Sequence, residues 1–105
     1  MTSSTGYDRG QLSELRAFYR AMGDTSRLRV VHLLASEGEM AISDIAQRLR
    51  LSHPLLSWHL RRLQRLGVIR MARLGREVRC SFNRERFAQL QERGYRALMN
   101  PGGVR

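Results

Sequence analysis

The segment from Ser52 to Phe82 restricts the fold of this chain more than any other part of the sequence. Ser52 is a favourable N-cap residue, and Pro54 fits the first helical turn, where its missing N–H costs nothing. An apolar stripe follows at helical spacing, formed by Leu56, Leu60, Leu63 and Leu66. Gly67 is typical of the position just beyond a helix end. The pattern therefore predicts an amphipathic helix from Ser52 to Leu66.

Two strand-like runs follow this helix directly. They are Val68–Arg73 and Glu77–Phe82, and the short link between them, Leu74-Gly75-Arg76, contains a glycine. A glycine in a short link between β-prone runs is a β-hairpin signal. We expect a hairpin with Arg76 at its tip and with Arg79 open to solvent.

A shorter helix is predicted before Ser52. Its expected N-cap is Ser43, and helical residues continue over about Asp44–Arg50. Few residues separate this helix from the next, as in a helix-turn-helix. The apolar stretch Met40-Ala41-Ile42 is expected to be extended and to pair at the edge of a small sheet. A hairpin directly after a helix-turn-helix, here Val68 to Phe82, is a wing.

The remaining segments are predicted to be helices. Helical spacing of apolar residues covers Gln11–Met22, and a second helix, capped by Thr25 or Ser26, continues to about Glu37. Helical spacing returns over Arg84–Asn100. The predicted fold is mainly α with a small β-hairpin: a winged helix-turn-helix in the order of four helices, two strands and a last helix.

Positive charge is concentrated in one part of the chain. The formal net charge is +10, and all 19 basic residues are arginines. Residues 1–60 carry a net charge of +1, whereas residues 61–86 hold nine arginines against Glu77 and Glu85, a net charge of +7. A basic block on an otherwise neutral chain is typical of a phosphate-binding face. The sequence therefore predicts binding to a polyanion.

Two stretches resemble a known family of regulators. They are AMGDTSRLRVVHLL at residues 21–34 and IAQRLRLSHPLLSWHLRRL at residues 45–63, and both are similar to the ArsR/SmtB (arsenic-repressor-like) family. Gly67-Val68-Ile69 and Gly75-Arg76 resemble the family's helix end and wing tip, so the resemblance spans about residues 17–82. It implies a dimeric repressor that binds an inverted-repeat operator in double-stranded DNA and leaves it when an inducer arrives.

The predicted recognition helix presents a polar and basic surface opposite its leucine stripe. Its residues are His53, Pro54, Ser57, Trp58, Arg61, Arg62 and Arg65. An α-helix fits the major groove, and its first turns reach the base edges. His53, Ser57 and Trp58 are the candidates for base contacts, by position and by the resemblance. Arg61 and Arg62 are expected to contact either a guanine or a phosphate.

Further arginines are expected to hold the DNA backbone. Arg65 lies farther from the N-terminus of the recognition helix and is interpreted as a phosphate contact. On the wing, the candidates for phosphate or minor-groove contacts are Arg73, Arg76 and Arg79. Arginine in a narrow minor groove favours A·T-rich flanking sequence.

Three neighbouring residues have an alternative to DNA contact. His59 lies beside the leucine stripe, and we interpret it as a partly buried, hydrogen-bonded histidine. Leu55 stands where the family often has Thr, Ala or Ser; it would meet a thymine methyl or pack against Trp58, and we expect packing. Trp58 itself either contacts DNA or covers the helix-turn-helix.

No metal site, cofactor or catalytic group is predicted. Metal-sensing members of the family carry paired thiols where this chain has Ala41 and Ser43, or Asp and His ligands on the last helix, which here has neither. The histidines share no ligand spacing; they are His32, His53 and His59. We therefore expect a regulator that is not a metal sensor of the known types. Its inducer stays open between a small organic molecule, a protein partner and none.

The single cysteine, Cys80, excludes an internal disulfide and suits a reducing cytoplasm. It is interpreted as an inward-facing strand residue rather than as a sensor. The polar N-terminus does not resemble a signal peptide, and no apolar run reaches the ~18 residues that span a bilayer. The sequence therefore predicts a cytoplasmic protein without a membrane segment.

The first and last helices carry more apolar surface than a small core covers, and the resemblance places both in a two-fold interface. We therefore expect a homodimer, with Gly94 permitting close helix approach.

The predicted organisation is a flexible arm over 1–9, a DNA-binding and dimerisation domain over 10–100, and a flexible end over 101–105. A winged helix that binds protein and one that binds RNA are the alternatives; an enzyme is disfavoured because no nucleophile–base pair, phosphate loop or paired carboxylates occur.

Overall fold

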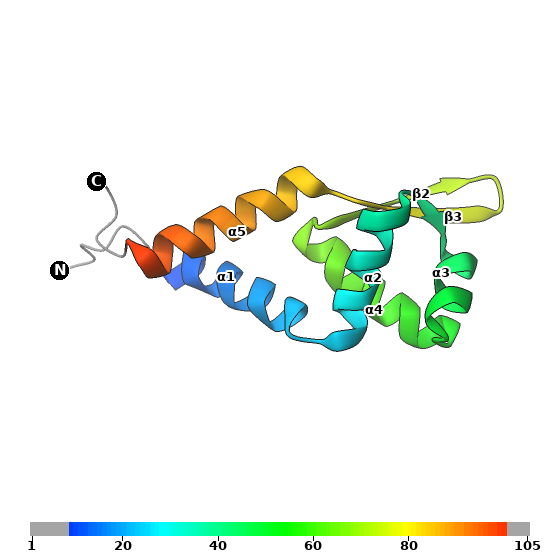
Figure 1. Ribbon diagram of the computed structural model, residues 1–105, viewed down its shortest axis with the longest axis horizontal. Helices are drawn as coiled ribbons and strands as arrows, with labels where there is room; N and C mark the ends of the chain where they lie inside the picture. Colours follow the sequence, from blue (N-terminus) through cyan, green and yellow to red (C-terminus); the bar gives the residue numbers. More distant parts are fainter. Residues whose placement is uncertain (1–8, 101–105) are drawn as a thin grey trace.

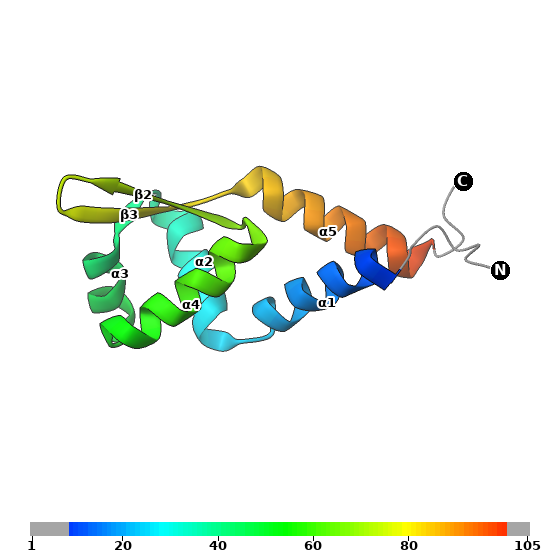
Figure 2. The same ribbon diagram turned by 180° about the vertical axis from the view of Figure 1, so that it is seen from behind.

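The computed structural model describes residues 9–100 as a winged helix-turn-helix with two long flanking helices. The elements, in chain order, are α1 (Arg9–Met22), α2 (Thr25–Glu37), β1 (Met40–Ala41), α3 (Ile42–Leu49), α4 (His53–Leu66), β2 (Ile69–Leu74), β3 (Glu77–Phe82) and α5 (Arg84–Met99). The molecule is elongated, 52 × 21 × 21 Å: α1 and α5 lie side by side at one end, and the remaining elements form the other (Figures 1 and 2). The predicted fold class is confirmed.

The ends of α4 follow the sequence prediction. The Ser52 hydroxyl accepts a hydrogen bond from the Leu55 backbone N–H at 3.3 Å, so Ser52 is the N-cap. Gly67 ends the helix in the left-handed region with φ 84°, a conformation that favours glycine. The start and the end of α4 are therefore determined by neighbouring residues in the sequence.

The predicted N-cap of α2 is wrong by one or two residues. Asp24, rather than Thr25 or Ser26, is the cap: its carboxylate accepts a hydrogen bond from the Arg27 backbone N–H at 3.0 Å. All three residue types are good caps, so their sequence alone does not separate them.

The predicted N-cap of α3 is wrong for a different reason. The helix begins at Ile42 with no side-chain cap, and Ser43 lies inside it. Strand β1 pairs with β3, Met40 with Cys80 and Ala41 with Arg79, which holds the chain extended up to Ala41. The helix therefore starts directly behind the strand. The predicted pairing of this stretch at a sheet edge is confirmed, although Ile42 is helical.

The sheet has three antiparallel strands in the order β1-β3-β2. Strands β2 and β3 form the predicted hairpin, and the pairing of Leu74 with Glu77 leaves Gly75 and Arg76 as the turn. Cys80 pairs with Met71 and is fully buried, which confirms its expected inward position. The wing extends away from the helices at its tip (Figure 1).

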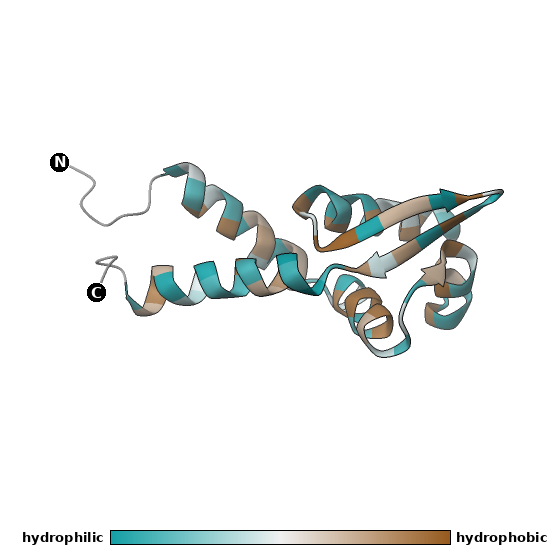
Figure 3. Ribbon diagram, turned by 90° about the horizontal axis from the view of Figure 1, so that it is seen from above, coloured by the Kyte–Doolittle hydropathy of each residue, from teal (hydrophilic) through white to brown (hydrophobic). Residues whose placement is uncertain are grey.

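The core forms where α2, α3 and α4 meet the sheet. Three leucines of the predicted stripe, Leu56, Leu60 and Leu63, are fully buried, and Leu66 is half-buried. They pack with the buried side chains of the other elements, among them Phe18, Val30, Leu34, Ile45, Val68 and Leu90. Apolar residues therefore alternate with polar ones along the helices (Figure 3). One face of α4 is committed to this core, which leaves the opposite face to other roles.

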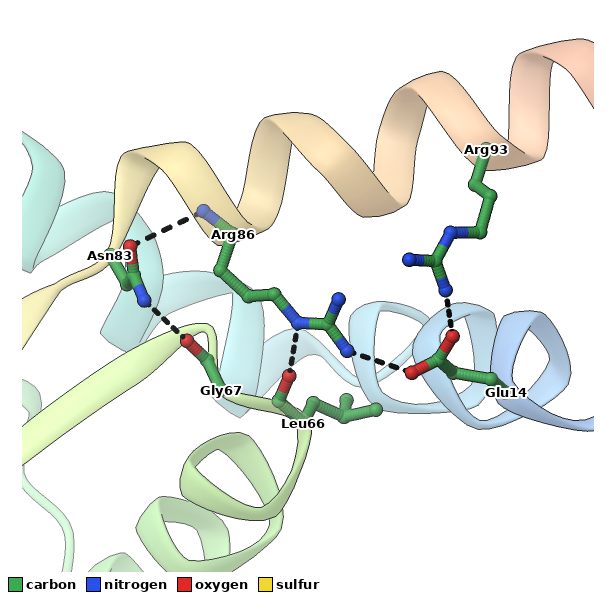
Figure 4. A network of polar contacts seen from close by, with 6 residues as sticks. All are labelled: Glu14, Leu66, Gly67, Asn83, Arg86 and Arg93. Atoms are coloured by element: carbon green, nitrogen blue, oxygen red, sulfur yellow. Dashed lines mark hydrogen bonds and ion pairs between the residues drawn. The ribbon is translucent and has the colours of Figure 1, made fainter. Parts of the chain in front are cut away.

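A polar network joins the end of α4 to α1 and α5 (Figure 4). Arg86 donates to the Leu66 carbonyl at 2.9 Å and to Glu14 at 2.7 Å, and Arg93 donates to the other oxygen of Glu14. Asn83 caps α5 and donates to the Gly67 carbonyl at 3.0 Å. These bonds fix the two long helices relative to α4.

The expected arm over 1–9 lies outside the described residues except for Arg9, which begins α1, and the expected end over 101–105 lies outside them altogether. Between residues 9 and 100, no helix has both the length and the apolar character needed to cross a membrane.

Candidate nucleic-acid interface

The outer surface of α4 carries two parallel flanks, because residues four apart lie on one side of a helix. His53, Ser57 and Arg61 form the first, which we call the groove flank; Ser57 is half-buried and the other two are exposed. Trp58, Arg62 and Arg65 form the second, the α1 flank, which lines a cavity shared with α1. Pro54 is exposed at the start of the helix. All seven predicted residues of this helix thus avoid the core.

The Trp58 ring is held by its neighbours. The Arg62 guanidinium lies 4.5 Å from the ring centroid, and the His59 ring meets it edge-on at 5.1 Å. The side chain is still 43% exposed, so it both covers the helix and remains accessible. Leu55 is also 43% exposed, so much of its side chain is open to solvent, and its packing against Trp58 stays a prediction.

His59 is buried and belongs to a polar cluster at the start of α2, which confirms the interpretation from sequence. Its Nδ1 lies 3.1 Å from Arg27 Nη1. Because arginine only donates, this Nδ1 is an unprotonated acceptor. Arg27 also donates to the Ala21 carbonyl at 3.0 Å, and Asp24 lies 4.0 Å from His59.

The ionisation of this cluster favours a neutral histidine and charged neighbours. Burial lowers the pKa of His59 below its ordinary value of 6.5; Asp24 opposes this shift, and the positive charge of Arg27 adds to it. The backbone N–H of Arg27 lowers the pKa of Asp24. The cluster is therefore a structural brace between α2 and α4, and His59 has no free nitrogen lone pair for another ligand.

The three wing arginines differ in their surroundings. Arg73 and Arg76 are exposed. Arg79, which the sequence predicted to be open to solvent, instead donates to Glu39 at 2.8 Å and to Glu77 at 2.9 Å, and these bonds raise its pKa. Two carboxylates thus neutralise Arg79, whereas the wing tip keeps its positive charge.

At the positions where metal-sensing proteins of the resembled family carry paired thiols, this chain has Ala41 and Ser43. Ala41 is buried in β1 and Ser43 is exposed on α3. Within residues 9–100, no three His, Cys, Asp or Glu side chains gather so that they would hold a metal ion. Burial raises the pKa of the Cys80 thiol to about 11, so it is protonated and unreactive at neutral pH.

Two arginines of α1 also belong to this surface, although they were not among the contact residues predicted from sequence. Arg16 and Arg20 line the cavity beside the α1 flank. Their spacing of four residues places them on one side of α1, but nothing in the sequence indicates that this side meets α4. The contact depends on the packing of two helices that are distant in sequence.

Part of this interface matches the profile of a known protein family. Residues 24–70, from the cap of α2 into β2, match the profile described as "Bacterial regulatory protein, arsR family". The chain is similar to a "Cadmium resistance transcriptional regulatory protein CadC homolog" of Staphylococcus aureus, with 31% identity over 77 residues, 73% of this chain and 64% of the relative. It is also similar to a "Transcriptional repressor SmtB homolog" of Synechocystis, with 32% identity over 68 residues, 65% of this chain and 51% of the relative. The chain therefore spans less than two thirds of either relative's length.

A solved structure shares the fold. The "ArsR-like Transcriptional Regulator from Rhodococcus sp. RHA1" superposes with a TM-score of 0.70 at 25% identity, covering 79% of this chain and 77% of that one. Each of these three similar proteins is named as a regulator or repressor of transcription.

Proposed function

We propose that this chain, of which residues 24–70 match the profile of the arsR family of bacterial regulatory proteins, is a cytoplasmic transcriptional regulator that binds double-stranded DNA. In this proposal it acts as a homodimeric repressor on an inverted-repeat operator. The observation that carries the proposal is the division of α4 into two faces: Leu56, Leu60 and Leu63 are fully buried on one, and the arginines Arg61, Arg62 and Arg65 are exposed on the other.

The proposed contacts follow from position on α4 and the wing. The N-terminal turns of α4 enter the major groove, where the groove flank (His53, Ser57 and Arg61) reads base edges and Pro54 lies against the groove wall. Arg62 and Arg65 lie toward the DNA backbone. The proposal moves Trp58, a candidate for base contact from its sequence position, to the same side, because Arg62 stacks on its ring. Arg73 and Arg76 reach phosphates or the minor groove from the wing, and Arg79 contributes less because Glu39 and Glu77 bind it.

The proposed dimer uses α1 and α5. Large apolar side chains remain exposed on these helices: Leu12, Tyr19, Tyr95, Leu98 and Met99 are 44% to 69% exposed. A second copy would remove this apolar surface from water. Two-fold symmetry then presents two copies of α4 to half-sites about one helical turn apart.

We further propose that the signal is not a metal bound in the thiol-pair or last-helix sites of related sensors. Ala41 and Ser43 supply no thiol, and α5 carries only Glu85 and Glu92 as acidic residues. Some relatives are named for cadmium resistance, yet the ligands expected for a soft metal are absent from these positions of the chain.

Selection of bound sites from random duplex DNA tests the proposal. We expect enrichment of an inverted repeat, and we expect Arg61→Gln to weaken binding to the selected site by about tenfold, because a charge-assisted contact is worth roughly 1–3 kcal/mol. Arg70→Gln is the matched control: Arg70 is an exposed arginine of β2 outside the proposed interface, and its loss should change affinity by less than about twofold.

Each alternative predicts a different result. Absence of any enriched duplex would contradict the proposal and favour a winged helix that binds protein. Equal competition by duplex RNA would indicate shape-based RNA binding instead. An enriched site without two-fold symmetry would retain DNA binding but contradict the proposed dimer.

A further inference from the structure

A cavity of about 420 Å³ lies between α1 and α4, on the α1 flank of α4 and beside the groove flank. Five arginines line it, Arg16 and Arg20 from α1, Arg27 from the start of α2, and Arg62 and Arg65 from α4. No acidic residue of the described part of the chain lines it. Volumes of this order are typical of sites for small molecules, so the cavity is larger than one phosphate contact requires.

The five arginines differ in their burial and in their hydrogen-bond and ion-pair partners. Arg27 is buried, and its guanidinium is bound by the Ala21 carbonyl and His59. It therefore forms a fixed base of the cavity. Arg16, Arg20 and Arg65 are exposed, and within residues 9–100 none of them has an acidic partner. Their charges remain available to an anion, and guanidinium groups bind phosphate and carboxylate oxygens in pairs.

The rest of the lining is apolar. Ala17 and Ala21 of α1, Leu66 at the end of α4 and the indole of Trp58 complete the cavity. An inorganic anion would leave these surfaces in contact with water. An anion with an apolar body would cover them, at about 25 cal/mol for each Å² removed from water.

We propose that this cavity is a binding site for a small organic anion with two negative charges on phosphate or carboxylate groups and an apolar body. Bound there, the anion neutralises Arg62 and Arg65, which the proposed function assigns to DNA, and so lowers affinity for DNA. This regulatory consequence rests on the proposed function, whereas binding of the anion to the free protein does not.

The site joins a proposed dimerisation helix to the recognition helix. Arg62 already stacks on Trp58, so an anion that draws this guanidinium toward Arg16 and Arg20 changes the surroundings of the indole. Trp58 is the only tryptophan of the chain, and its fluorescence therefore reports occupancy directly.

Titration of phenyl phosphate into the full-length chain, by calorimetry and by Trp58 fluorescence, tests the proposal. We expect saturable binding at one site per chain, and inorganic phosphate about tenfold weaker because it lacks the apolar body. The double variant Arg16→Gln/Arg20→Gln should bind phenyl phosphate at least about tenfold more weakly. Arg70→Gln/Arg76→Gln removes the same charge from the exposed wing and should bind within about twofold of the unmodified chain.

Equal weakening of phenyl phosphate binding in the two double variants would overturn the proposal, because the anion would then sense only net charge. Absence of saturable binding to the unmodified chain would also overturn it. If Arg16→Gln/Arg20→Gln lost DNA affinity and the unmodified chain bound no phenyl phosphate, the proposal would also be overturned, and the cavity would be assigned to a DNA phosphate.

A second measurement separates this proposal from the proposed function. Saturating phenyl phosphate should lower the affinity of the unmodified chain for its selected DNA site by about fivefold or more, and that of Arg16→Gln/Arg20→Gln by much less. Anion binding in a chain that binds no DNA would retain the site and contradict the proposed function. DNA binding that is unchanged at saturating anion would contradict the regulatory role.

Discussion

His59 shows how one residue of α4 is withdrawn from the surface that we propose to face DNA. Its sequence position, beside leucines that point inward, indicates burial, and the structure adds the partner that makes burial tolerable. A buried imidazole without an acceptor or donor partner would be costly. Arg27 supplies this partner and is itself bound by the Ala21 carbonyl, so the brace links the end of α1, the start of α2 and α4.

The brace predicts a pH-dependent stability. The unfolded chain protonates His59 near its ordinary pKa of 6.5, whereas the folded chain, with a lowered pKa, does so only at lower pH. The contribution of neutral His59 is therefore complete above about pH 6.5 and is lost as pH falls through the folded-state pKa. In urea unfolding between about pH 7 and pH 5, the difference in unfolding free energy between the unmodified chain and His59→Gln should shrink as pH falls.

His32→Gln is the control for this measurement, because His32 is an exposed histidine of α2. Comparison with it removes effects that follow from the loss of any one imidazole. A pH-independent difference for His59→Gln would mean that His59 titrates alike in the folded and unfolded chains.

At the scale of elements, the sequence predicts caps, stripes and turns, which depend on neighbouring residues. It does not predict features that depend on pairing between residues distant in the chain. The cap Ser52, the leucine stripe and the turn at Gly75 each depend on neighbours within a few residues, and all were predicted. Ser43 fails as a cap because Ala41 pairs with Arg79, which lies far along the chain. The same reason explains why the approach of α1 to α4, and with it the cavity, was not predicted.

The network at Glu14 is a second feature that depends on residues distant in sequence. It predicts that loss of Glu14 lowers the unfolding free energy more than loss of an exposed glutamate does. Glu14 accepts from Arg86 and Arg93, and all three side chains are only 24% to 38% exposed. Glu14→Gln should lower the unfolding free energy by about 1 kcal/mol, an estimate reduced for solvent screening. Glu92→Gln removes the exposed pair with Arg96 on α5 and should cost less than about 0.5 kcal/mol. Equal losses in denaturant unfolding would show that the network adds nothing to an ordinary surface pair.

Gly94 predicts a coupling between α1 and α5 within one chain. A Cβ at this position would lie 1.9 Å from the Tyr19 hydroxyl oxygen, so the ring would have to move. In the Tyr19→Ala background, Gly94→Ala should raise the unfolding free energy by up to about 1 kcal/mol through helix propensity. In the presence of Tyr19 the gain should be smaller or reversed. Identical effects in both backgrounds, measured as a double-mutant cycle, would exclude this contact.

On the scale of the whole molecule, the two ends of the long axis differ in their exposed side chains. Large apolar side chains are exposed on α1 and α5 at one end, and Arg73 and Arg76 are exposed on the wing at the other (Figures 1 and 3). A two-fold axis through the helical end would place two basic ends on the same side of a duplex. The charge block was visible in the sequence, but its division into free and neutralised arginines was not, since Glu39 reaches Arg79 only through the sheet.

This division predicts the salt dependence of DNA binding. If a dimer neutralises about six phosphates, the logarithm of the binding constant falls with the logarithm of salt concentration at a slope near −5. Arg76→Gln removes one exposed contact per chain, two per dimer, and should bring the slope to about −4. Arg79→Gln should change it less, because Glu39 and Glu77 already neutralise that guanidinium. Fluorescence anisotropy with the selected duplex gives these slopes. A slope near zero for the unmodified chain would contradict phosphate binding altogether, and a larger change for Arg79→Gln than for Arg76→Gln would mean that DNA displaces the two glutamates.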